Sequence, residues 1–467
     1  MSGSRRTALF IAILAGFLTP FDLSAVNIAL PSIGAEFAMD AVSLGWVATA
    51  YLLASAAFLL PFGRIGDISG RKRIFTAGLA VFTIASFFML FAPSAPAVIG
   101  MRLIQGVGAA MIFGTAVAIL TSVTPLNERG RVLGIYTTAV YIGLSCGPFI
   151  GGFLTEVFGW RSIFFINIPV GLFAIALVIL FLKGEWADAK GEPFDSGGSV
   201  LYGLTLVAIM YGFSLLPAAA GTALLAAGLV LALLFIWHER RIQFPLLDVR
   251  LWTENRAFAF SNLAAFINYS ATFSVTFFMS LYLQLNRGFD PWTAGAILVI
   301  QPVVQAAVSP FAGRFSDRIC PGKIASFGMW LTALGLGALV FLSNTTPLAV
   351  IAGILVILGA GLGFFSSPNT NAVMSSVEKK YYGIASGTLG TMRLVGQAMS
   401  MGIAMMIIAL FIGRVQVTSA QHAQLLSSME VAFGFFAVLC IAGIFLSLVR
   451  YSCEKDAAGP RLQPPGS

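Results

Sequence analysis

The sequence predicts an all-α polytopic membrane protein, and three observations support this prediction. Hydrophobic residues make up 58% of the 467 residues, charged residues make up only 10%, and the mean hydropathy is +0.91. Fourteen stretches are apolar over about 20 residues, the length of a helix that crosses the hydrocarbon core of a bilayer. Basic residues fall mainly in alternate connections between these stretches, as membrane orientation requires. This composition excludes a water-soluble globular domain.

Each apolar stretch is expected to form one membrane-spanning helix. The first begins like a signal peptide, but its apolar run continues to Pro31 without a cleavage site and further spans follow, so we interpret it as an uncleaved helix. In chain order, the predicted helices cover residues 7–31, 43–65, 74–92, 97–121, 132–154, 162–182, 197–216, 220–237, 257–284, 292–312, 323–343, 347–371, 383–412 and 431–449.

The positive-inside rule predicts the orientation. If the N-terminus is cytoplasmic, 22 of the 27 lysines and arginines lie inside, and only Arg161, Arg287 and Arg414 lie outside. Arg102 and Arg393 remain, and both fall within predicted helices. An even number of helices places both termini on the same side, so we expect cytoplasmic N- and C-termini at the cell membrane. The scattered basic residues also explain the net charge of +8 without a nucleic-acid partner.

A repeated motif suggests how the chain is divided. PFGRIGDISGRK (Pro61 to Lys72) closes the second predicted helix, and PFAGRFSDRICPGK (Pro310 to Lys323) closes the tenth. Two six-helix halves separated by an additional helix pair would give this offset. The expected division is residues 1–190, a two-helix insert at 191–250, residues 251–455, and a cytoplasmic tail at 456–467. Parallel repeats are typical of secondary transporters, which bind substrate near the midplane between the halves.

The connection GRIGDISGRKR (Gly63 to Arg73) resembles the signature of the major facilitator superfamily. Glycines permit a tight turn, and Asp67 can accept hydrogen bonds from a helix N-terminus or pair with arginine. The sequence departs from the family at Ile68, where a basic residue is usual. The resemblance implies a connection that takes part in the conformational switch, formed by Gly63, Asp67, Gly70, Arg71 and, in the repeat, Asp317.

The fifth predicted helix resembles the antiporter motif of that superfamily. Its sequence GIYTTAVYIGLSCGPFIGG contains Gly134, Gly143, Gly147, Pro148, Gly151 and Gly152. Glycines at near-helical spacing let another backbone approach closely, and proline bends a helix. A packing face without influence on transport direction is the alternative. Three further features resemble the fourteen-helix drug:proton antiporter family, which contains quaternary-ammonium and multidrug exporters. They are GWRSIFFINIPVG (Gly159 to Gly171), SGTLGTMRLVGQAMS (Ser386 to Ser400) and the additional helix pair. The implied fold is the major facilitator fold.

Asp22 and Arg102 are the candidates for proton coupling. Counted from Pro31, Asp22 lies about 13 Å inside its helix at 1.5 Å per residue. Arg102, counted from Ala97, lies about 8 Å inside, and its side chain reaches further. The two are therefore expected at one depth, and the resemblance implies that both helices face a central cavity. The alternatives are that Arg102 extends to the interface, and that Asp22 only orients its own helix or bonds to Ser24 or Asn27.

Seven other polar side chains are candidates for the substrate cavity: Asn27, Gln105, Asn268, Gln301, Gln305, Asn369 and Arg393. The tenth predicted helix, residues 292–312, contains two glutamines but no carboxylate. Some members of the family that export divalent organic cations have an additional acid there. We therefore expect monovalent, neutral or anionic amphiphiles rather than dications.

The resulting prediction is a secondary transporter that exports small amphiphilic, drug-like compounds in exchange for protons. The alternative is a proton-coupled exporter of one metabolite, antibiotic or siderophore. An enzyme is disfavoured, because His238 and His422 fall in predicted loops and no catalytic or metal-ligand spacing is found. No phosphate-binding GxxxxGK[ST] is present either. We expect a monomer in the lipid bilayer without cofactor or metal, and four free cysteine thiols.

Overall fold

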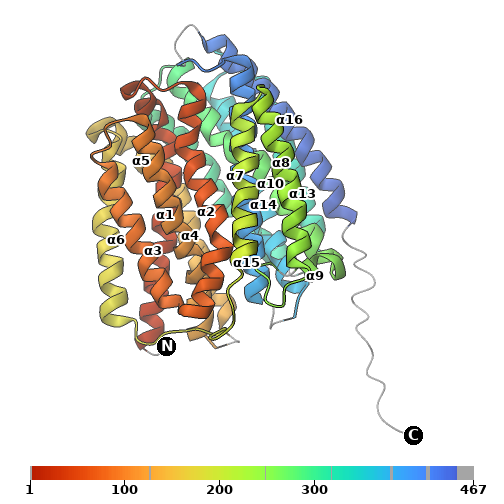
Figure 1. Ribbon diagram of the computed structural model, residues 1–467. Coiled ribbons are helices and arrows are strands. Elements are labelled where there is room, and N and C mark those ends of the chain that lie inside the picture. Colours follow the sequence, from red (N-terminus) through yellow and green to blue (C-terminus); the bar gives the residue numbers. More distant parts are fainter. Residues whose placement is uncertain are drawn as a thin grey trace.

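The chain forms a bundle of long helices packed side by side in a computed structural model (Figure 1). The structure describes residues 3–125, 128–247, 249–316, 318–378, 382–416 and 421–449. Within these ranges every regular element is a helix, and fourteen spans are long and apolar enough to cross a membrane. The prediction of an all-α polytopic membrane protein with fourteen spans is therefore confirmed.

The first eight spans are single helices: α1 (Gly3–Glu36), α2 (Ala41–Ser69), α3 (Arg71–Met89), α4 (Ala95–Val123), α5 (Arg129–Phe158), α6 (Arg161–Phe181), α7 (Ser196–Leu215) and α8 (Ala219–Glu239). The remaining six spans follow the short helix α9 (Val249–Glu254): α10 (Arg256–Leu281) continuing into the π-helix η1 (Tyr282–Asn286), α11 (Pro291–Leu298) with α12 (Ile300–Ser316), α13 (Pro321–Leu339), α14 (Leu348–Ser375), α15 (Tyr382–Phe411) and α16 (His422–Val449).

The largest differences from the predicted bounds lie at the ends of the first and last spans. α1 continues past Pro31 to Glu36, and α16 begins at His422 rather than at residue 431. Both extensions contain polar residues, which lower the hydropathy of a window without preventing the backbone hydrogen bonds of a helix. Pro20 and Pro31 both lie inside α1. Proline is tolerated in membrane helices because neighbouring groups satisfy the freed backbone positions.

Contacts between helices place α5 and α7 at positions that connect distant parts of the chain. α5 packs against α1 and also against α11 and α12. α7 packs against α8, and it also contacts α2 and α15 (Figure 1). The predicted division into residues 1–190, 191–250, 251–455 and 456–467 stays a prediction, and the last of these segments lies outside the described residues.

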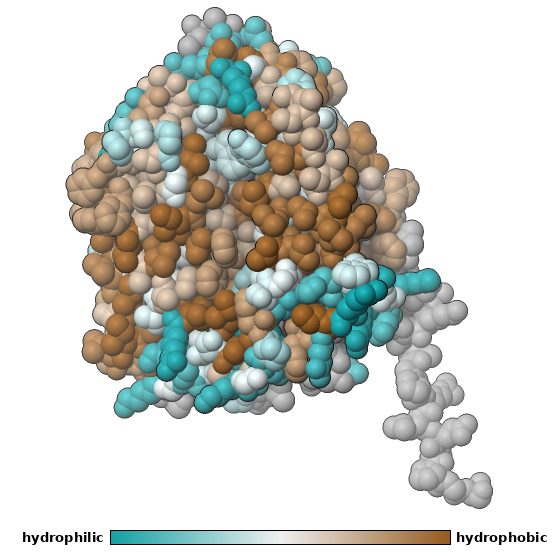
Figure 2. Space-filling view, in the orientation of Figure 1, coloured by the Kyte–Doolittle hydropathy of each residue, from teal (hydrophilic) through white to brown (hydrophobic). Residues whose placement is uncertain are grey.

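The surface has the distribution that a bilayer requires. Hydrophobic side chains form a broad band across the visible face, and hydrophilic ones gather below and above it, most densely at the end where α1 begins (Figure 2). Exposed phenylalanines such as Phe88, Phe165 and Phe445 belong to the membrane spans. These side chains would face lipid rather than water.

The described cysteines differ in whether they are bonded. Cys146 and Cys440 are free thiols, whereas Cys320 is disulfide-bonded, so the prediction of a free thiol is wrong for Cys320. That prediction considered only spacing along the sequence, which does not show which cysteines become neighbours in space.

Asp290 caps α11 by accepting hydrogen bonds from the Thr293 hydroxyl and N–H, and these bonds lower the pKa of Asp290.

Candidate functional site

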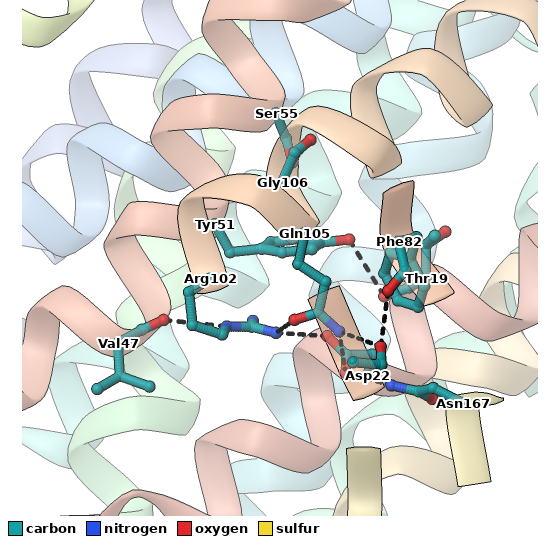
Figure 3. A network of polar contacts seen from close by, with 11 residues as sticks. Thr19, Asp22, Val47, Tyr51, Ser55, Phe82, Arg102, Gln105, Gly106 and Asn167 are labelled. Atoms are coloured by element: carbon teal, nitrogen blue, oxygen red, sulfur yellow. Dashed lines mark hydrogen bonds and ion pairs between the residues drawn. The ribbon is translucent and has the colours of Figure 1, made fainter. Parts of the chain in front are cut away.

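Asp22 on α1 and Arg102 on α4 form an ion pair in the interior of the bundle (Figure 3). Arg102 Nη1 lies 2.5 Å from Asp22 Oδ2, and both side chains are 0% exposed. The predicted contact between the two is therefore present, and Arg102 does not extend to the membrane interface. Ser24, considered as a local partner for Asp22, instead donates its hydroxyl to the Leu144 carbonyl on α5 at 3.0 Å.

Two amides complete the coordination of the Asp22 carboxylate. Asn167 on α6 donates to Asp22 Oδ1 at 2.7 Å, and Gln105 on α4 donates to the same oxygen at 3.3 Å. Gln105 also accepts a hydrogen bond from Arg102 Nη1 at 2.7 Å and donates to Ser86 Oγ on α3 at 2.9 Å. We call Asp22, Arg102, Gln105, Asn167 and Ser86 the Asp22 network. The Asp22 carboxylate thus accepts hydrogen bonds from three side chains, one of them the Arg102 guanidinium.

α2 supplies the other side of the arginine. Arg102 Nε donates to the Val47 carbonyl at 3.1 Å, and the guanidinium carbon lies 4.4 Å from the centre of the Tyr51 ring. An arginine over an aromatic face is attracted by the negative potential of the ring, and more strongly where water is absent. Arg102 Nη2 is the one nitrogen of this guanidinium without a hydrogen-bond partner among the described residues.

The sequence RLIQG brings these groups together by its spacing. Arg102 and Gln105 are three residues apart and therefore share one face of α4. Gly106 continues that face, where a Cβ would lie 2.4 Å from the Tyr51 carbonyl oxygen. The missing side chain lets α2 approach closely enough for Ser55 Oγ to donate to the Gly106 carbonyl at 3.1 Å. Glycine at this position thus positions the α2 groups against Arg102.

The Asp22 network lies within the first six helices and not between these helices and the ones that follow α9. Its side chains come from α1, α3, α4 and α6, and its further contacts come from α2. The expectation that Asp22 faces a central cavity is not met in this conformation. Asn167 and Ser86 provide hydrogen bonds inside an apolar bundle, where a carboxylate without partners would cost several kcal/mol. Gln105, predicted for the substrate cavity, also belongs to this network.

The predicted switch connection is built around Arg71. Gly70 joins α2 to α3 with a φ of 120°, which non-glycine residues rarely adopt. Arg71 pairs with Asp67 at 2.6 Å and with Asp188 at 2.7 Å, and it donates to Ser122 Oγ at 2.6 Å. Asp67 therefore pairs with arginine, one of the two arrangements expected for it.

The α6–α7 connection crosses the switch connection. The Ala189 N–H donates to the Asp67 carbonyl at 3.0 Å, and the Arg71 N–H donates to the Trp186 carbonyl at 2.9 Å. Gly63 lies one turn before Asp67 in α2, where an added Cβ would be 3.7 Å from the Gly114 carbonyl oxygen of α4. Asp317 lies outside the described residues.

The glycines of α5 form contact surfaces for two different neighbours. A Cβ added to Gly143 would lie 2.4 Å from the Phe17 carbonyl oxygen of α1, and one added to Gly152 would lie 2.4 Å from the Pro291 carbonyl oxygen of α11. Gly147 and Gly151 likewise contact Ser24 and Ala25 of α1, and the Pro148 carbonyl lies against Gly295 of α11. A Cβ at Gly134 would meet nothing within 4 Å, so the prediction that this glycine belongs to the close-packed face is wrong.

The remaining cavity candidates are distributed over several helices. Asn27 on α1 is 2% exposed with an unbonded Oδ1, and Asn268 on α10 is 0% exposed with neither amide atom bonded. Gln301 and Gln305 lie on α12, Asn369 lies on α14, and all three are largely buried. Arg393 lies on α15 and is described below. Apart from Gln105, none of the seven forms a hydrogen bond or ion pair with Asp22 among the described residues.

Sequence reasoning missed two contributions to the Asp22 network. The apolar stretches do not single out Ser86 or Tyr51, and they show Asn167 only as a polar residue inside a predicted helix. A polar residue inside an apolar stretch is the available signal, but it does not indicate which neighbouring helix the residue faces.

Comparison with known proteins gives a consistent family. The family model for the Major Facilitator Superfamily matches residues 12–401 and 262–464. The riboflavin transporter RibZ of Clostridioides difficile is 32% identical over 82% of this chain and 84% of its own. The cephamycin export protein CmcT of Amycolatopsis lactamdurans is 33% identical over 98% and 94%, respectively. The multidrug resistance protein Stp of Mycobacterium tuberculosis is 29% identical over 85% and 75%.

The fold is also similar to a solved transporter. A bacterial homologue of the human lysosomal transporter Spinster, in an inward-facing and unoccupied conformation, superimposes with a TM-score of 0.71. The match covers 96% of this chain and 97% of that one, at 15% sequence identity. At this identity the likeness concerns the fold.

Proposed function

This chain belongs to the major facilitator superfamily, and from that premise we propose that it exports small amphiphilic compounds in exchange for protons by alternating access. It is a multi-span transporter of small molecules in the cell membrane and not an enzyme. The multidrug resistance protein Stp among its relatives supports drug-like substrates for this chain. We further propose that it works as a monomer with both termini in the cytoplasm.

The Asp22–Arg102 ion pair is the observation that carries the proposed proton coupling. Both charges are fully buried, and the carboxylate depends on donors from α4 and α6. Protonation of Asp22 would remove the charge that balances Arg102, so protonation and helix movement are linked. A conformation that separates α1 from α4 and α6 removes these donors and favours the protonated acid. An inward-moving proton contributes about 2.3 kcal/mol per 100 mV of membrane potential.

The switch connection and the α5 glycines have roles in the same proposal. Breaking the Arg71 contacts with Asp67 and Asp188 would release the α2–α3 connection from the α6–α7 connection. α5 would slide on α1 and α11, because the glycines leave no side chains between the backbones. The two predicted six-helix halves would then move relative to each other around a site near the midplane.

A second function has specific support. The match to CmcT spans nearly the whole of both chains, and RibZ is named for a single compound. This favours an exporter of one metabolite or antibiotic as the alternative to a multidrug exporter. Uptake of a panel of unrelated dyes distinguishes the two, because a dedicated exporter transports few of them.

Transport into reconstituted vesicles tests the proposed coupling. A pH gradient alone is imposed, and accumulation of a dye is compared for the wild type, Asp22→Asn and Glu430→Gln. Glu430 is an exposed carboxylate on α16 and serves as the matched control. We expect the wild type and Glu430→Gln to accumulate the dye against its gradient and Asp22→Asn to equilibrate it only. Concentrative uptake by Asp22→Asn at the wild-type level would overturn the assignment.

A further inference from the structure

Arg393 carries a positive charge inside a membrane span and has no acidic partner among the described residues. It lies nine residues beyond Ile384, where the α15 span begins, or roughly 14 Å into the span at 1.5 Å per residue. No ion pair among the described residues includes Arg393, and its Nε is buried without a hydrogen-bond partner. Arg102, by contrast, is neutralised by Asp22.

Three tyrosines from two other helices surround the Arg393 charge. Its guanidinium carbon lies 5.4 Å from the centre of the Tyr269 ring on α10. Tyr141 and Tyr136, both on α5, lie nearby. Tyr141 Oη donates to Ser366 Oγ on α14 at 3.1 Å. We call these five residues the Arg393 cluster.

The Arg393 cluster lies where α5 meets helices from the second half of the chain. Tyr141 is nine residues from the start of its span at Val132, and Ser366 is nine residues from the end of its span at Ser375. Each is therefore roughly 14 Å from that end, the same depth as Arg393. Unlike the Asp22 network, this cluster joins α5 to α10, α14 and α15, the interface at which the proposed mechanism places substrate.

The physical cost of this arrangement indicates a missing partner. An arginine at the centre of a membrane helix costs about 2.5–3.5 kcal/mol on insertion scales, and such residues usually pair with one another or line a pathway. The Tyr269 ring recovers part of this cost by a cation–π contact but leaves Nε unbonded. A planar guanidinium has the geometry to bind a carboxylate through two parallel hydrogen bonds.

We propose that the Arg393 cluster binds the anionic group of an aromatic amphiphilic substrate. The guanidinium pairs with a singly charged carboxylate, the tyrosine hydroxyls provide further donors, and the rings contact the apolar body of the substrate. A cationic amphiphile is repelled, because nothing in the described part of the cluster balances Arg393. This assignment of the substrate class rests on the proposed export function.

A matched series of probes tests the charge preference. Purified wild-type protein is titrated with 2-naphthoate, its methyl ester and 2-naphthylmethylammonium, which share one ring system and differ in charge. We expect the carboxylate to bind about tenfold more tightly than the ester, a difference of about 1.4 kcal/mol, and the ammonium to bind most weakly. A wild type that does not prefer the carboxylate overturns the proposal.

Three variants assign the preference to Arg393. Arg393→Gln is expected to bind carboxylate and ester equally, with ester affinity unchanged, and Arg393→Lys to retain part of the preference. Arg256→Gln, which removes an exposed arginine at the start of α10, is the matched control and should behave as the wild type. An undiminished preference in Arg393→Gln contradicts the proposal.

Two further measurements separate folding and coupling from recognition. Tyr269→Phe keeps the ring under Arg393 and removes only its hydroxyl. A partial loss of carboxylate preference in this variant supports the Arg393 cluster even if Arg393→Gln is unstable. An unchanged preference argues against a donor role for Tyr269. Uptake driven by a pH gradient is measured separately. If carboxylate binding depends on Arg393 but a pH gradient drives no uptake by the wild type, the proposed proton exchange fails and the proposed Arg393 site stands. If the gradient drives transport but the preference is absent, the site fails alone.

Discussion

At the scale of single residues, Asp22 and Arg102 each offset the free-energy cost of burying the other's charge in an apolar interior. Both are 0% exposed, and Arg102 holds the carboxylate together with Gln105 and Asn167. A buried pair of this kind contributes little net stability, but removal of one partner leaves an uncompensated buried charge. The same dependence links the protonation of Asp22 to the positions of α1, α4 and α6.

This dependence predicts the outcome of a double-mutant cycle. Asp22→Asn leaves Arg102 without its counter-charge and is expected to lower the unfolding free energy by about 3–5 kcal/mol. Arg102→Gln is expected to be similarly costly, whereas the double variant should recover much of the loss because no lone charge remains. Thermal unfolding of the purified proteins in one detergent measures all four. Additive losses in the double variant would show that the pair is not energetically coupled.

Part of this site was predictable at the residue scale and part was not. The depths of Asp22 and Arg102 follow from helix geometry alone, and those depths match in the structure. Asn167 on α6 and Tyr51 on α2 contact the pair directly, and Ser86 on α3 contacts it through Gln105. Those helices are apolar on nearly all sides, so the sequence contains no periodic pattern that fixes their rotation. For the same reason the sequence did not show that Asp22 faces the interior of the first six helices instead of the expected cavity.

At the scale of helices, glycine positions decide which backbones touch. Gly106 brings α4 against α2 behind Arg102, and Gly143 brings α5 against α1. The spacing of small residues predicted a close-packed face on α5, and four of its five glycines contact neighbouring helices. Gly134 does not, because it precedes Gly143 by nine residues, or two and a half turns, and therefore lies on the opposite side of α5.

Two glycines on α4 provide a matched test of the packing behind Arg102. In Gly106→Ala the new Cβ would lie 2.4 Å from the Tyr51 carbonyl oxygen, and α2 must move away. We expect a loss of about 1–3 kcal/mol from overpacking. Gly100→Ala, on the same helix, adds a Cβ that meets nothing within 4 Å and should leave the melting temperature unchanged. Equal effects of the two substitutions would contradict the packing described here.

Two glycines on α5 test whether close packing of this helix is needed for transport. Gly143→Ala places a Cβ 2.4 Å from the Phe17 carbonyl oxygen and is expected to reduce the rate of dye transport severalfold, because α5 can no longer slide on α1. Gly134→Ala faces open space and should transport at the wild-type rate. Initial rates of uptake at equal protein content measure both. Wild-type transport by Gly143→Ala would mean that this close approach is not needed for the transport cycle.

At the scale of the whole molecule, several contacts close the end of the bundle opposite the start of α1. Gln284 Nε2 in η1 donates to the Ile28 carbonyl on α1 at 2.9 Å, and the Ala41 N–H donates to the Val415 carbonyl at 3.0 Å. Gly152 and Pro291 touch at the same end. Alternating access requires these contacts between distant parts of the chain to break. The number of spans was predictable from hydropathy, whereas these contacts depend on how the first and second sets of helices meet.

Removal of one closing contact should shift the conformational equilibrium. Gln284→Ala loses a hydrogen bond worth about 1 kcal/mol, which corresponds to roughly a fivefold increase in the ratio of open to closed molecules at this end. Distances between spin labels on the α1–α2 and α13–α14 connections report the two populations. Gln243→Ala, an exposed glutamine in the α8–α9 connection, is the control and should leave the distribution unchanged. A distribution unaffected by Gln284→Ala would remove this contact from the closed state.

Asp22 is proposed to exchange a proton in each transport cycle, and substrate-induced proton movement reports this exchange. Vesicles containing a pH-sensitive dye are given substrate without any imposed gradient, and the internal pH and the substrate flux are recorded together. The wild type should move protons opposite to substrate. Asp22→Asn should exchange substrate across the membrane while the internal pH stays constant. Proton movement by Asp22→Asn in the wild-type ratio to substrate would contradict the account.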